Sequence, residues 1–310
     1  MTQLTTQDGT PISRFGFGTM QFGGGADETA STEMFHQACS VGINHFDTAF
    51  LYTDGASETI LGKLVKPMRP QTLVATKIAY DGNGDPAKLQ QDFDVSRRRL
   101  CMECVDILYL HRDVGQDLSR ALAWLAKQQS SSAIRYIGLS NFSAWRVMAA
   151  NAMAKELGTK IDILQPMYNL VKRQAEVEIL PMCIDQGITC APYSPLGGGL
   201  LTGKYINANK GRLATDERYN ARYSLPFMHQ AATDLSELAR ELETDPATLA
   251  AAWVSHHPAK PIPLLSARSN EQLAPSLAAL SFDMTDALYE RISTLSPTPP
   301  PATDRWEERT

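Results

Sequence analysis

Short apolar runs alternate with longer amphipathic stretches along most of this chain, and this alternation restricts the possible fold more than any other feature. Eight runs have the length and residue types of strands, at 14–18, 45–47, 74–77, 105–111, 134–141, 161–166, 187–192 and 261–265. Stretches with helical spacing of apolar residues lie between or after them, at 32–41, 57–65, 86–100, 118–129, 143–157, 176–186 and 270–280. With the helices predicted after the seventh strand, at 231–243 and 246–256, there are eight strand-helix repeats. They predict an α/β fold, a (β/α)8 TIM barrel whose functional site lies at the carboxyl ends of the strands.

The remaining segments fit a single barrel domain spanning residues 1–310. Residues 1–13 alternate polar and apolar side chains around Asp8 and Gly9, which predicts a β-hairpin cap. A long insertion before the eighth strand carries predicted helices at 231–243 and 246–256, and an extra C-terminal helix is expected at 285–294. The proline-rich tail, 296–310, is expected to be extended and loosely held.

Composition argues against several classes of protein. With 43% hydrophobic and 20% charged residues, and no apolar run near the roughly 18 residues of a membrane span, the chain is typical of a soluble globular protein. The N-terminus lacks the basic start and apolar middle of a signal peptide, so we expect a cytoplasmic location. The net charge is −5, and Arg97, Arg98 and Arg99 lie in a helical stretch. A solvated helix face is therefore favoured over nucleic-acid binding.

The cysteines and histidines favour neither a disulfide framework nor a metal centre. Five cysteines, an odd number, indicate free thiols. Cys101 and Cys104 form a C-x-x-C pair, but no second ligand pair or redox-motif context accompanies them, so two thiols at a helix-to-strand turn are favoured. Of the six histidines only His111 stands well at a predicted strand end, so no metal is expected.

Residues able to move protons or orient a substrate stand at or just after the ends of several predicted strands. Asp47 ends the second strand, Lys77 the third and His111 the fourth, and Tyr52 follows in the loop after Asp47. Each alone has an ordinary structural explanation, such as a capping Asp or a satisfied core His. Because the carboxyl ends of the strands meet on one face of a parallel barrel, the four together predict a catalytic site.

Several longer motifs, taken in order, resemble those of the aldo-keto reductases. They are F-D-T-A-F-L-Y at 46–52, L-Y-L-H at 108–111, G-L-S-N at 138–141, Q-P-M-Y-N at 165–169 and Y-S-P-L-G-G-G-L-L-T-G-K-Y at 193–205. The resemblance spans about residues 14–295, and the last motif looks most like the bacterial branch related to sugar-aldehyde, pyridoxal and general stress reductases and to the channel-associated β-subunits. It implies NADPH-dependent reduction of aldehydes and ketones to alcohols by direct hydride transfer, with the tetrad Asp47, Tyr52, Lys77 and His111.

The chemistry of the tetrad also follows from the residue types. A carbonyl that accepts a hydride needs a proton on its oxygen as charge develops there. Tyr52 is the predicted acid, and its phenol, with an ordinary pKa near 10, needs a cation such as Lys77 close by to act near neutral pH. Asp47 would hold Lys77 in place, and His111 would orient the carbonyl or assist proton transfer.

The predicted cofactor site follows the later strands of the barrel. Ser140, Asn141 and Gln165 offer partners for the nicotinamide carboxamide, and Tyr193 offers an aromatic platform for its ring. The resemblance extends this set to Thr19, Ser194, Leu196, Gly198, Lys204, Ser266, Arg268, Gln272 and Ser276. For the glycines at 197–199, a merely flexible loop is the alternative.

The adenosine end departs from the family pattern at two positions. Ser266 stands where relatives often have Gly, and Ser276 stands where they have the Asn that meets adenine. Arg268 remains, and because a guanidinium suits a phosphate dianion, NADP(H) is favoured over NAD(H). The glycines at 23–25 lack the spacing and immediate helix of a dinucleotide-binding turn, so that loop is expected on the substrate side.

Residues just beyond the strand ends are the candidates for contact with a small carbonyl substrate: Phe22, Phe50, Leu51, Tyr80, Arg112 and Phe142. Arg112 suits an anionic or polyhydroxylated aldehyde, and it equally suits pairing with Asp113 or Asp81. The insertion at 205–228 is a candidate lid over the cofactor. Two other functions stay open: an NADP(H)-sensing binding protein with little turnover, like the channel β-subunits, and an NAD(P)-dependent sugar dehydrogenase.

Overall fold

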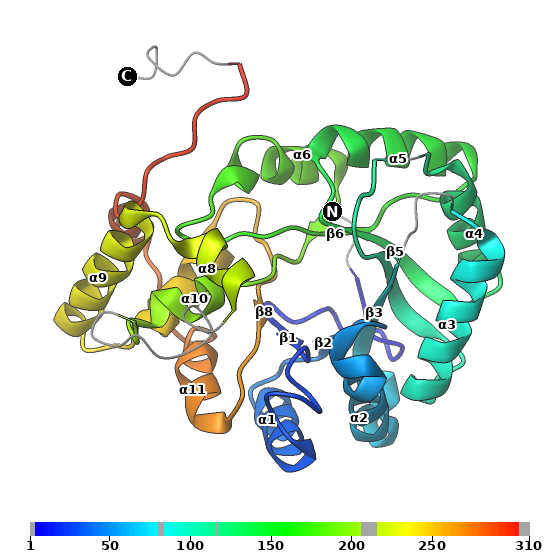
Figure 1. The fold of residues 1–310 in the computed structure, drawn as a ribbon, viewed down its shortest axis with the longest axis horizontal. Coiled ribbons are helices and arrows are strands. Elements are labelled where there is room, and N and C mark those ends of the chain that lie inside the picture. Colours follow the sequence, from blue (N-terminus) through cyan, green and yellow to red (C-terminus); the bar gives the residue numbers. More distant parts are fainter. Residues whose placement is uncertain (1–3, 80–83, 116, 206–215, 304–310) are drawn as a thin grey trace.

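The computed structural model describes residues 4–79, 84–115, 117–205 and 216–303, and eight parallel strands within them form one curved sheet (Figure 1). The strands are β1 (Gly16–Gly18), β2 (His45–Asp47), β3 (Leu73–Ile78), β4 (Val105–Leu110), β5 (Ile134–Ser140), β6 (Ile163–Gln165), β7 (Thr189–Cys190) and β8 (Leu264–Leu265). Their order in the sheet is β7-β6-β5-β4-β3-β2-β1-β8. The sheet closes because Ile262 N donates to Cys190 O at 2.8 Å and Leu264 N donates to Pro192 O at 2.9 Å. The predicted (β/α)8 barrel is confirmed.

Helices surround the strands on the outside of the barrel (Figure 1). Those described are α1 (Glu28–Ser40), α2 (Ala56–Val65), α3 (Pro86–Leu100), α4 (Ser119–Ser130), α5 (Ala144–Glu156), α6 (Ile179–Gln186), α8 (Glu217–Tyr223), α9 (Pro226–Glu241), α10 (Pro246–His256), α11 (Asn270–Ala278) and α12 (Asp286–Ser293). Four short 3-10 turns are also described: η1 (Tyr52–Gly55), η2 (Lys66–Gln71), η3 (Gln174–Glu176) and η4 (Gly197–Thr202). The extra C-terminal helix predicted from the sequence is α12.

Some element boundaries match the sequence prediction and others do not. Helices α3 and α10 begin and end as predicted, because an Asp N-cap followed by Pro marks each start. The predicted start of α1 at residue 32 is wrong, because the helix begins four residues earlier, at Glu28, where Asp27 caps it by accepting a hydrogen bond from Ala30 N. Helix α9 likewise begins at Pro226 rather than at 231. Strands β6 and β7 are shorter than predicted, since an apolar run can continue past the residues that the ladder pairs.

The N-terminal hairpin closes one end of the barrel. Thr5 pairs antiparallel with Pro11, which confirms the predicted hairpin from residue 4 onward, and residues 1–3 lie outside the described part. Asn44, which precedes β2, and Arg135, near the start of β5, both hydrogen-bond to this hairpin. Leu4 joins the side chains that fill the barrel: Leu73, Ala75, Ile107, Tyr109, Ile163, Ala191 and Ile262. The hairpin therefore covers the amino-terminal end, and the site is left to the opposite, carboxyl-terminal end.

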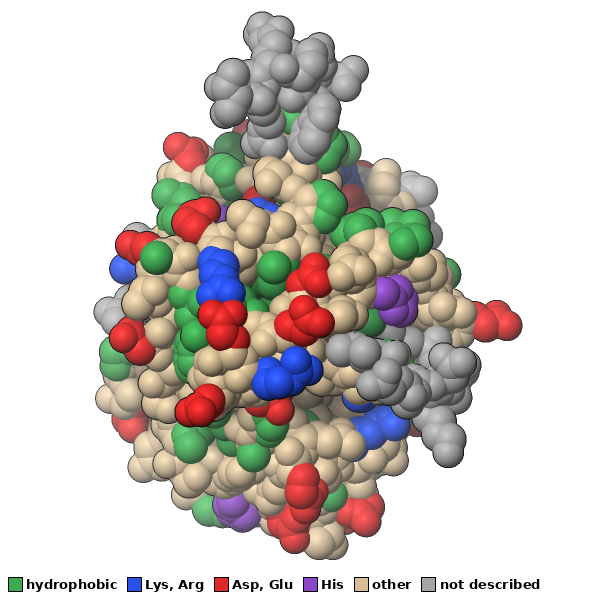
Figure 2. Space-filling model, turned by 90° about the vertical axis from the view of Figure 1, so that its left-hand side faces the viewer, with side chains coloured by type: hydrophobic (Ala, Val, Ile, Leu, Met, Phe, Trp, Pro, Cys, Tyr) green, Lys and Arg blue, Asp and Glu red, His purple; other side chains and the backbone are tan. Residues whose placement is uncertain are grey.

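The structure also bears on the cysteines, on possible membrane spans and metal sites, and on the surface charge. All five cysteines are free, and Cys101 ends α3 with a left-handed φ of 55°. No helix of the described residues is long and apolar enough to cross a membrane, and those residues hold no group of three potential metal ligands. Acidic and basic side chains are interspersed on the face that includes α9 (Figure 2). Beyond α12 the chain extends away from the body to residue 303, where the described part of the tail ends (Figure 1).

Candidate active site

Asp47, the last residue of β2, forms a buried ion pair at the mouth of the barrel. Asp47 and Lys77 are both buried, and the Lys77 ammonium donates to Asp47 Oδ1 at 2.5 Å. Gln165, at the end of β6, donates from Nε2 to the other carboxylate oxygen at 2.8 Å. Because both oxygens of Asp47 are bonded, the cost of burying its charge is largely offset.

The Lys77 ammonium donates its other hydrogen bonds to the loop that follows β2. It donates to Thr48 O at 2.7 Å and to Tyr52 Oη at 3.3 Å, and it lies 4.8 Å from the centroid of the Tyr52 ring. Tyr52 opens η1, a tight turn in which Thr53 has a positive φ of 48°. Thr53 Oγ1 donates to Phe22 O at 2.7 Å, which ties the turn to the loop after β1. The phenol is therefore held against the ammonium.

Burial and charge act in opposite directions on the Tyr52 phenol. Burial raises the pKa of Tyr52 and the Lys77 ammonium lowers it, and the pKa lies above its ordinary value. Burial by itself would lower the pKa of Lys77, but the Asp47 carboxylate and the phenol raise it above its usual value. The site at neutral pH thus holds an ammonium beside a protonated phenol. The lowering by Lys77 that the sequence suggested is present, but burial exceeds it.

His111 stands directly after β4, with its backbone N–H bonded to Ile78 O at 3.0 Å. Its ring meets the Tyr52 ring nearly edge-on, with centroids 5.9 Å apart and an interplanar angle of 79°. Burial, then the charges of Lys77 and Arg112, lower the pKa of His111 to about 3. The imidazole is therefore neutral at physiological pH, and it can donate one N–H to an oxygen that also meets the phenol.

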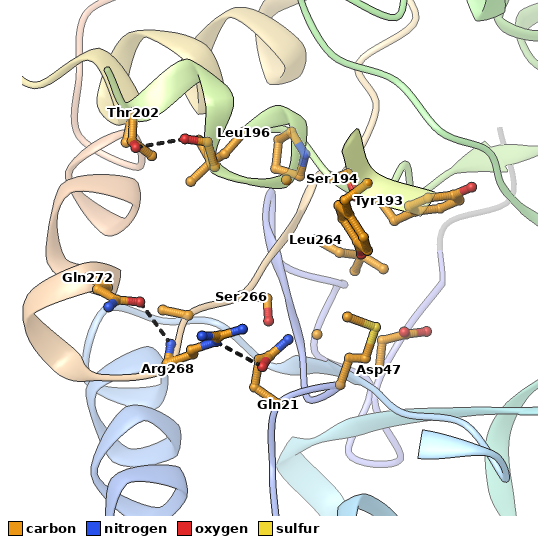
Figure 3. Close-up of a pocket in the computed structure, with 18 of the residues that line it drawn as sticks. Gln21, Asp47, Tyr193, Ser194, Leu196, Thr202, Leu264, Ser266, Arg268 and Gln272 are labelled. Atoms are coloured by element: carbon orange, nitrogen blue, oxygen red, sulfur yellow. Dashed lines mark hydrogen bonds between the residues drawn. The ribbon is translucent and has the colours of Figure 1, made fainter. Parts of the chain in front are cut away.

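A cavity of about 870 Å³ extends from these residues across the carboxyl ends of the strands. Its walls include most of the residues predicted from the sequence: Asp47, Tyr52, His111, Arg112, Ser140, Asn141, Gln165, Tyr193, Ser194, Leu196, Gly198, Lys204, Ser266, Arg268 and Gln272. Asp47 and Tyr193 lie at one end of the cavity, and Arg268 and Gln272 lie at the other (Figure 3). This extent suits a long ligand with polar groups at both ends.

Asn141 connects three other predicted residues through hydrogen bonds. Its Nδ2 donates to His111 O and to Ser140 Oγ, both at 3.0 Å, and Tyr193 Oη donates to its Oδ1 at 2.6 Å. Asn141 has a left-handed φ of 60°, which Asn tolerates better than most residues. The side-chain amide is thus fixed at the cavity wall. The hydroxyl bond of Tyr193 was not predicted.

The turn η4 brings backbone close to its neighbours in the cavity wall. Gly198 and Gly199 have φ values of 66° and 94°, a region that favours glycine. A Cβ on Gly198 would lie 2.8 Å from the Tyr219 ring, and one on Gly199 would lie 2.7 Å from Lys204 Nζ. The glycines therefore form a tight turn with a left-handed backbone beside the Lys204 ammonium.

Arg268 stands between two glutamines at the far end of the cavity. Its Nε donates to Gln21 Oε1 at 3.3 Å, and its backbone N–H donates to Gln272 Oε1 at 3.4 Å (Figure 3). Asp245 also lines the cavity, but its carboxylate caps α10 by accepting a hydrogen bond from Ala247 N. No ion-pair partner of Arg268 occurs among the described residues, so its guanidinium is available to an anion.

Several predicted site residues do not line the cavity. Phe22 and Phe142 are buried in the hydrophobic core, so the prediction that they line the mouth is wrong. Ser276 is buried away from the wall, and Thr19 directs its hydroxyl to Asp47 O at 3.0 Å. Lys77 also lies behind the wall, where it acts through Asp47 and the phenol. The side chain of an apolar or small residue after a strand can face either the cavity or the protein core, and the sequence alone does not distinguish these two orientations.

The other predicted substrate residues have different positions. Phe50 lies under the Arg99 guanidinium, 4.8 Å from ring centroid to Cζ, and does not belong to the cavity wall. Leu51 is exposed and is likewise outside that wall. Tyr80 and Asp81 lie outside the described residues. Of the predicted substrate residues in the described part of the chain, Arg112 alone lines the cavity.

Sequence reasoning missed several residues of the cavity wall, among them Gln21, Thr202, Tyr219, Arg222 and Asp245. Tyr219 and Arg222 belong to α8, inside the insertion considered as a lid, of which residues 206–215 lie outside the described part. The available signal was the abundance of Arg and Tyr in that insertion. Thr202 belongs to the motif at 193–205, but that motif gave its side chain no role. Nothing in the sequence marked Gln21, because a neutral polar residue in a loop has many other uses.

Comparisons with known proteins show what this chain is similar to in sequence. The sequence profile of the Aldo/keto reductase family matches residues 14–297. The chain is 29% identical to Uncharacterized oxidoreductase YrpG of Bacillus subtilis over 94% of each chain. It is 27% identical to a Probable voltage-gated potassium channel subunit beta of Oryza sativa, over 97% of this chain and 98% of that one. It is also 25% identical to the NADP(+) aldo-keto reductase yakc of Schizosaccharomyces pombe, over 91% of this chain and 87% of that one.

Proposed function

The chain belongs to the aldo/keto reductase family of nicotinamide-dependent oxidoreductases, and from this premise we propose that it reduces aldehydes and ketones with NADPH. The observation that carries the proposal is an unbroken series of hydrogen bonds from Gln165 through Asp47 and Lys77 to Tyr52. That series ends on a phenol that lines the cavity, next to the neutral imidazole of His111. A proton donor, a cation behind it and a second hydrogen-bond donor are what carbonyl reduction requires.

Tyr52 is the proposed proton donor. NADPH, when bound, supplies the hydride. As negative charge develops on the carbonyl oxygen, the phenol proton moves from Tyr52 Oη to that oxygen, and the Lys77 ammonium stabilises the phenolate that remains. Asp47 keeps Lys77 charged and in place. His111 donates a hydrogen bond to the same oxygen and so fixes the position of the carbonyl.

The residues proposed to hold the cofactor fit its chemistry at both ends of the cavity. Near the tetrad, Asn141 and Gln165 present amide groups and Tyr193 presents an aromatic ring. At the far end, Arg268 offers a guanidinium suited to the 2′-phosphate that distinguishes NADPH from NADH. Between them, η4 and the Lys204 ammonium suit the pyrophosphate. A relative named as an NADP(+) enzyme supports the same preference.

The test is NADPH oxidation, followed by absorbance, with methylglyoxal, 4-nitrobenzaldehyde, pyridoxal and glyceraldehyde. We expect turnover of at least one of these, and a loss of roughly 100-fold or more in Tyr52→Phe while NADPH binding persists. Tyr289→Phe on α12, outside the cavity wall, is the matched control and should keep the wild-type rate. A Tyr52→Phe variant as fast as the wild type would contradict the assignment of the acid.

The similarity to a potassium channel subunit beta favours one second candidate, an NADP(H)-sensing protein with little turnover. The same assay separates the two functions. Tight binding of NADPH with turnover below about one per minute, far below the usual 1–10³ per second, would support the sensor. Oxidation of sugars with NAD(P)+ faster than any aldehyde reduction would instead support the dehydrogenase alternative.

A further inference from the structure

We propose that the physiological carbonyl substrate carries an anionic group, which binds between Arg112 and Arg222 at the tetrad end of the cavity. This inference rests on the proposed reductase function and specifies its class of substrate. Both arginines line the cavity that also includes Tyr52 and His111. An aldehyde held by its anionic end against the two guanidinium groups would direct its other end toward the phenol.

The first observation is that Arg112 is not neutralised by its neighbour in the chain. The sequence left open a pair between Arg112 and either Asp113 or Asp81, and Asp81 lies outside the described residues. In the structure the Asp113 carboxylate is occupied by Arg146, whose Nε and Nη2 each donate to it at 3.1 Å. Within the described residues no carboxylate forms an ion pair with Arg112, so none of them neutralises its charge at the cavity wall.

The second observation is that Arg222 is positioned by aromatic packing and not by an acid. Its guanidinium lies over the Tyr219 ring, 5.2 Å from the centroid, and the side chain is half-buried. Tyr219 in turn lies so close to Gly198 that a Cβ there would be 2.8 Å from its ring. In the part of the chain that the structure describes, no carboxylate forms an ion pair with Arg222. The wall therefore holds a second cation that no described carboxylate neutralises.

The charges of Arg112 and Arg222 both act on the Tyr193 phenol. Burial raises the pKa of the Tyr193 phenol, and Arg222 and Arg112 both oppose that rise. Tyr193 hydrogen-bonds to Asn141, which is itself bonded to His111, so the phenol lies at the tetrad end of the cavity. Two cations that act on one partly buried point favour an anion there, and guanidinium groups bind carboxylate or phosphate oxygens in pairs.

The alternative is that Arg112 and Arg222 bind the phosphates of the cofactor and not a substrate. The phosphates have other cations available, because Lys204 stands beside η4 and Arg268 at the far end of the cavity. Arg112 lies just after β4, next to His111, whereas Lys204 and Arg268 follow β7 and β8. The only cavity carboxylate at the tetrad end among the described residues is Asp47, which is already bonded to Lys77 and Gln165. Counted over the described residues alone, the charged side chains at the tetrad end therefore sum to a positive charge.

The experiment compares an anionic aldehyde with a neutral analogue in each of two pairs. The kcat/KM for 4-carboxybenzaldehyde is measured beside that for its neutral methyl ester, and glyceraldehyde 3-phosphate is measured beside glyceraldehyde. Wild type, Arg112→Gln, Arg222→Gln and the double variant are compared, with Arg240→Gln on the exposed surface of α9 as a control of equal charge change. The Kd for NADPH is measured for each protein.

We expect the wild type to prefer an anionic aldehyde over its neutral analogue by about tenfold or more, and the double variant to lose that preference. Arg240→Gln should keep the preference, and the Kd for NADPH should change by less than about threefold in the double variant. Which of the two pairs shows the preference distinguishes a carboxylate from a phosphate. Equal rates for charged and neutral aldehydes in the wild type would overturn the inference and leave the reductase function standing. A loss of NADPH affinity with no change in substrate preference would assign the arginines to the cofactor instead.

The inference can also be tested if no aldehyde is reduced, the outcome that would refute the proposed function. Binding of 4-(hydroxymethyl)benzoate and of its methyl ester is then measured by calorimetry in the presence of NADP+. Stronger binding of the acid, lost in the double variant, would support the anion site. Equal binding of acid and ester would overturn it.

Discussion

Replacing Lys77 with Met removes the cation on which the proposed proton transfer depends. The Lys77 Nζ lies 3.3 Å from Tyr52 Oη, so its attraction for a full phenolate is about 5 kcal/mol at an effective dielectric constant of about 20. Tyr52 faces the cavity and is only half-buried, which makes this an upper value. If the proton is about half transferred in the transition state, the loss is about 2 to 2.5 kcal/mol. We therefore expect kcat to fall about 30- to 70-fold.

The assay is steady-state oxidation of NADPH with 4-nitrobenzaldehyde, with the Kd for NADPH measured in parallel. Lys77→Met also leaves the Asp47 carboxylate buried and without its ammonium, a change that typically costs about 3–5 kcal/mol of stability. The double variant Asp47→Asn, Lys77→Met removes that unpaired charge, so its stability should recover while its rate does not. Lys63→Met, an exposed lysine on α2, is the control for the substitution itself.

Two outcomes would refute this reasoning. A Lys77→Met variant that is folded and loses less than about threefold in kcat would show that the ammonium does not assist the phenol. Recovery of the rate in the double variant would show that the loss came from the unpaired Asp47 and not from the missing cation at Tyr52.

Three further predictions follow from the same contacts. Arg268→Ala should weaken NADPH binding by roughly tenfold and leave NADH binding nearly unchanged, because the guanidinium is assigned to the 2′-phosphate. Fluorescence titrations with both cofactors measure this, and equal losses of affinity for NADPH and NADH would contradict that role. Asp106→Ala should cost about 3–5 kcal/mol in urea unfolding, since this buried carboxylate lies 2.7 Å from Arg69 and 3.0 Å from Arg135; a loss below about 1 kcal/mol would show that the network is dispensable. Burial lowers the pKa of His45 to about 4, and neither of its ring nitrogens has a hydrogen-bond partner among the described residues. Unfolding therefore takes up a proton below about pH 6.5, and the free energy of unfolding falls by up to about 1.4 kcal/mol per pH unit down to about pH 4. His45→Leu should therefore flatten the decline of unfolding free energy between pH 6.5 and 5, and parallel slopes for the two proteins would refute the assignment.

Much of the fold was predictable because local chemistry determined it. Asp85 and Asp245, each followed by proline, mark the starts of α3 and α10. The carboxylate accepts a hydrogen bond from a free backbone N–H of the first turn, and proline has no N–H that would need a partner there. The alternation of apolar runs and amphipathic stretches is likewise written in single residues and their spacing. The exact ends of β6 and β7 were not predictable, because pairing in the ladder depends on the neighbouring strand.

Part of the candidate site was likewise predictable from the sequence, and part was not. Asp47, Lys77 and His111 were predictable as a group, because each stands at the end of a strand and a parallel barrel brings such ends to one face. The bond from Gln165 to Asp47 was not predictable, since the two residues are 118 positions apart in the chain. Phe22 turned out to be core for a similar reason, because a loop aromatic can face either way until the packing around it is known.

The sequence by itself therefore determined which elements form and which side chains can carry the chemistry, through periodicity, capping and strand-end position. Only the tertiary structure decided which charges are compensated. Arg146 lies 33 positions from Asp113 yet takes its carboxylate, which leaves Arg112 without that partner, and α8 carries Arg222 to the same cavity from the distant insertion. Compensation of charge depends on distances between residues far apart in the chain, and those distances exist only after the barrel has closed.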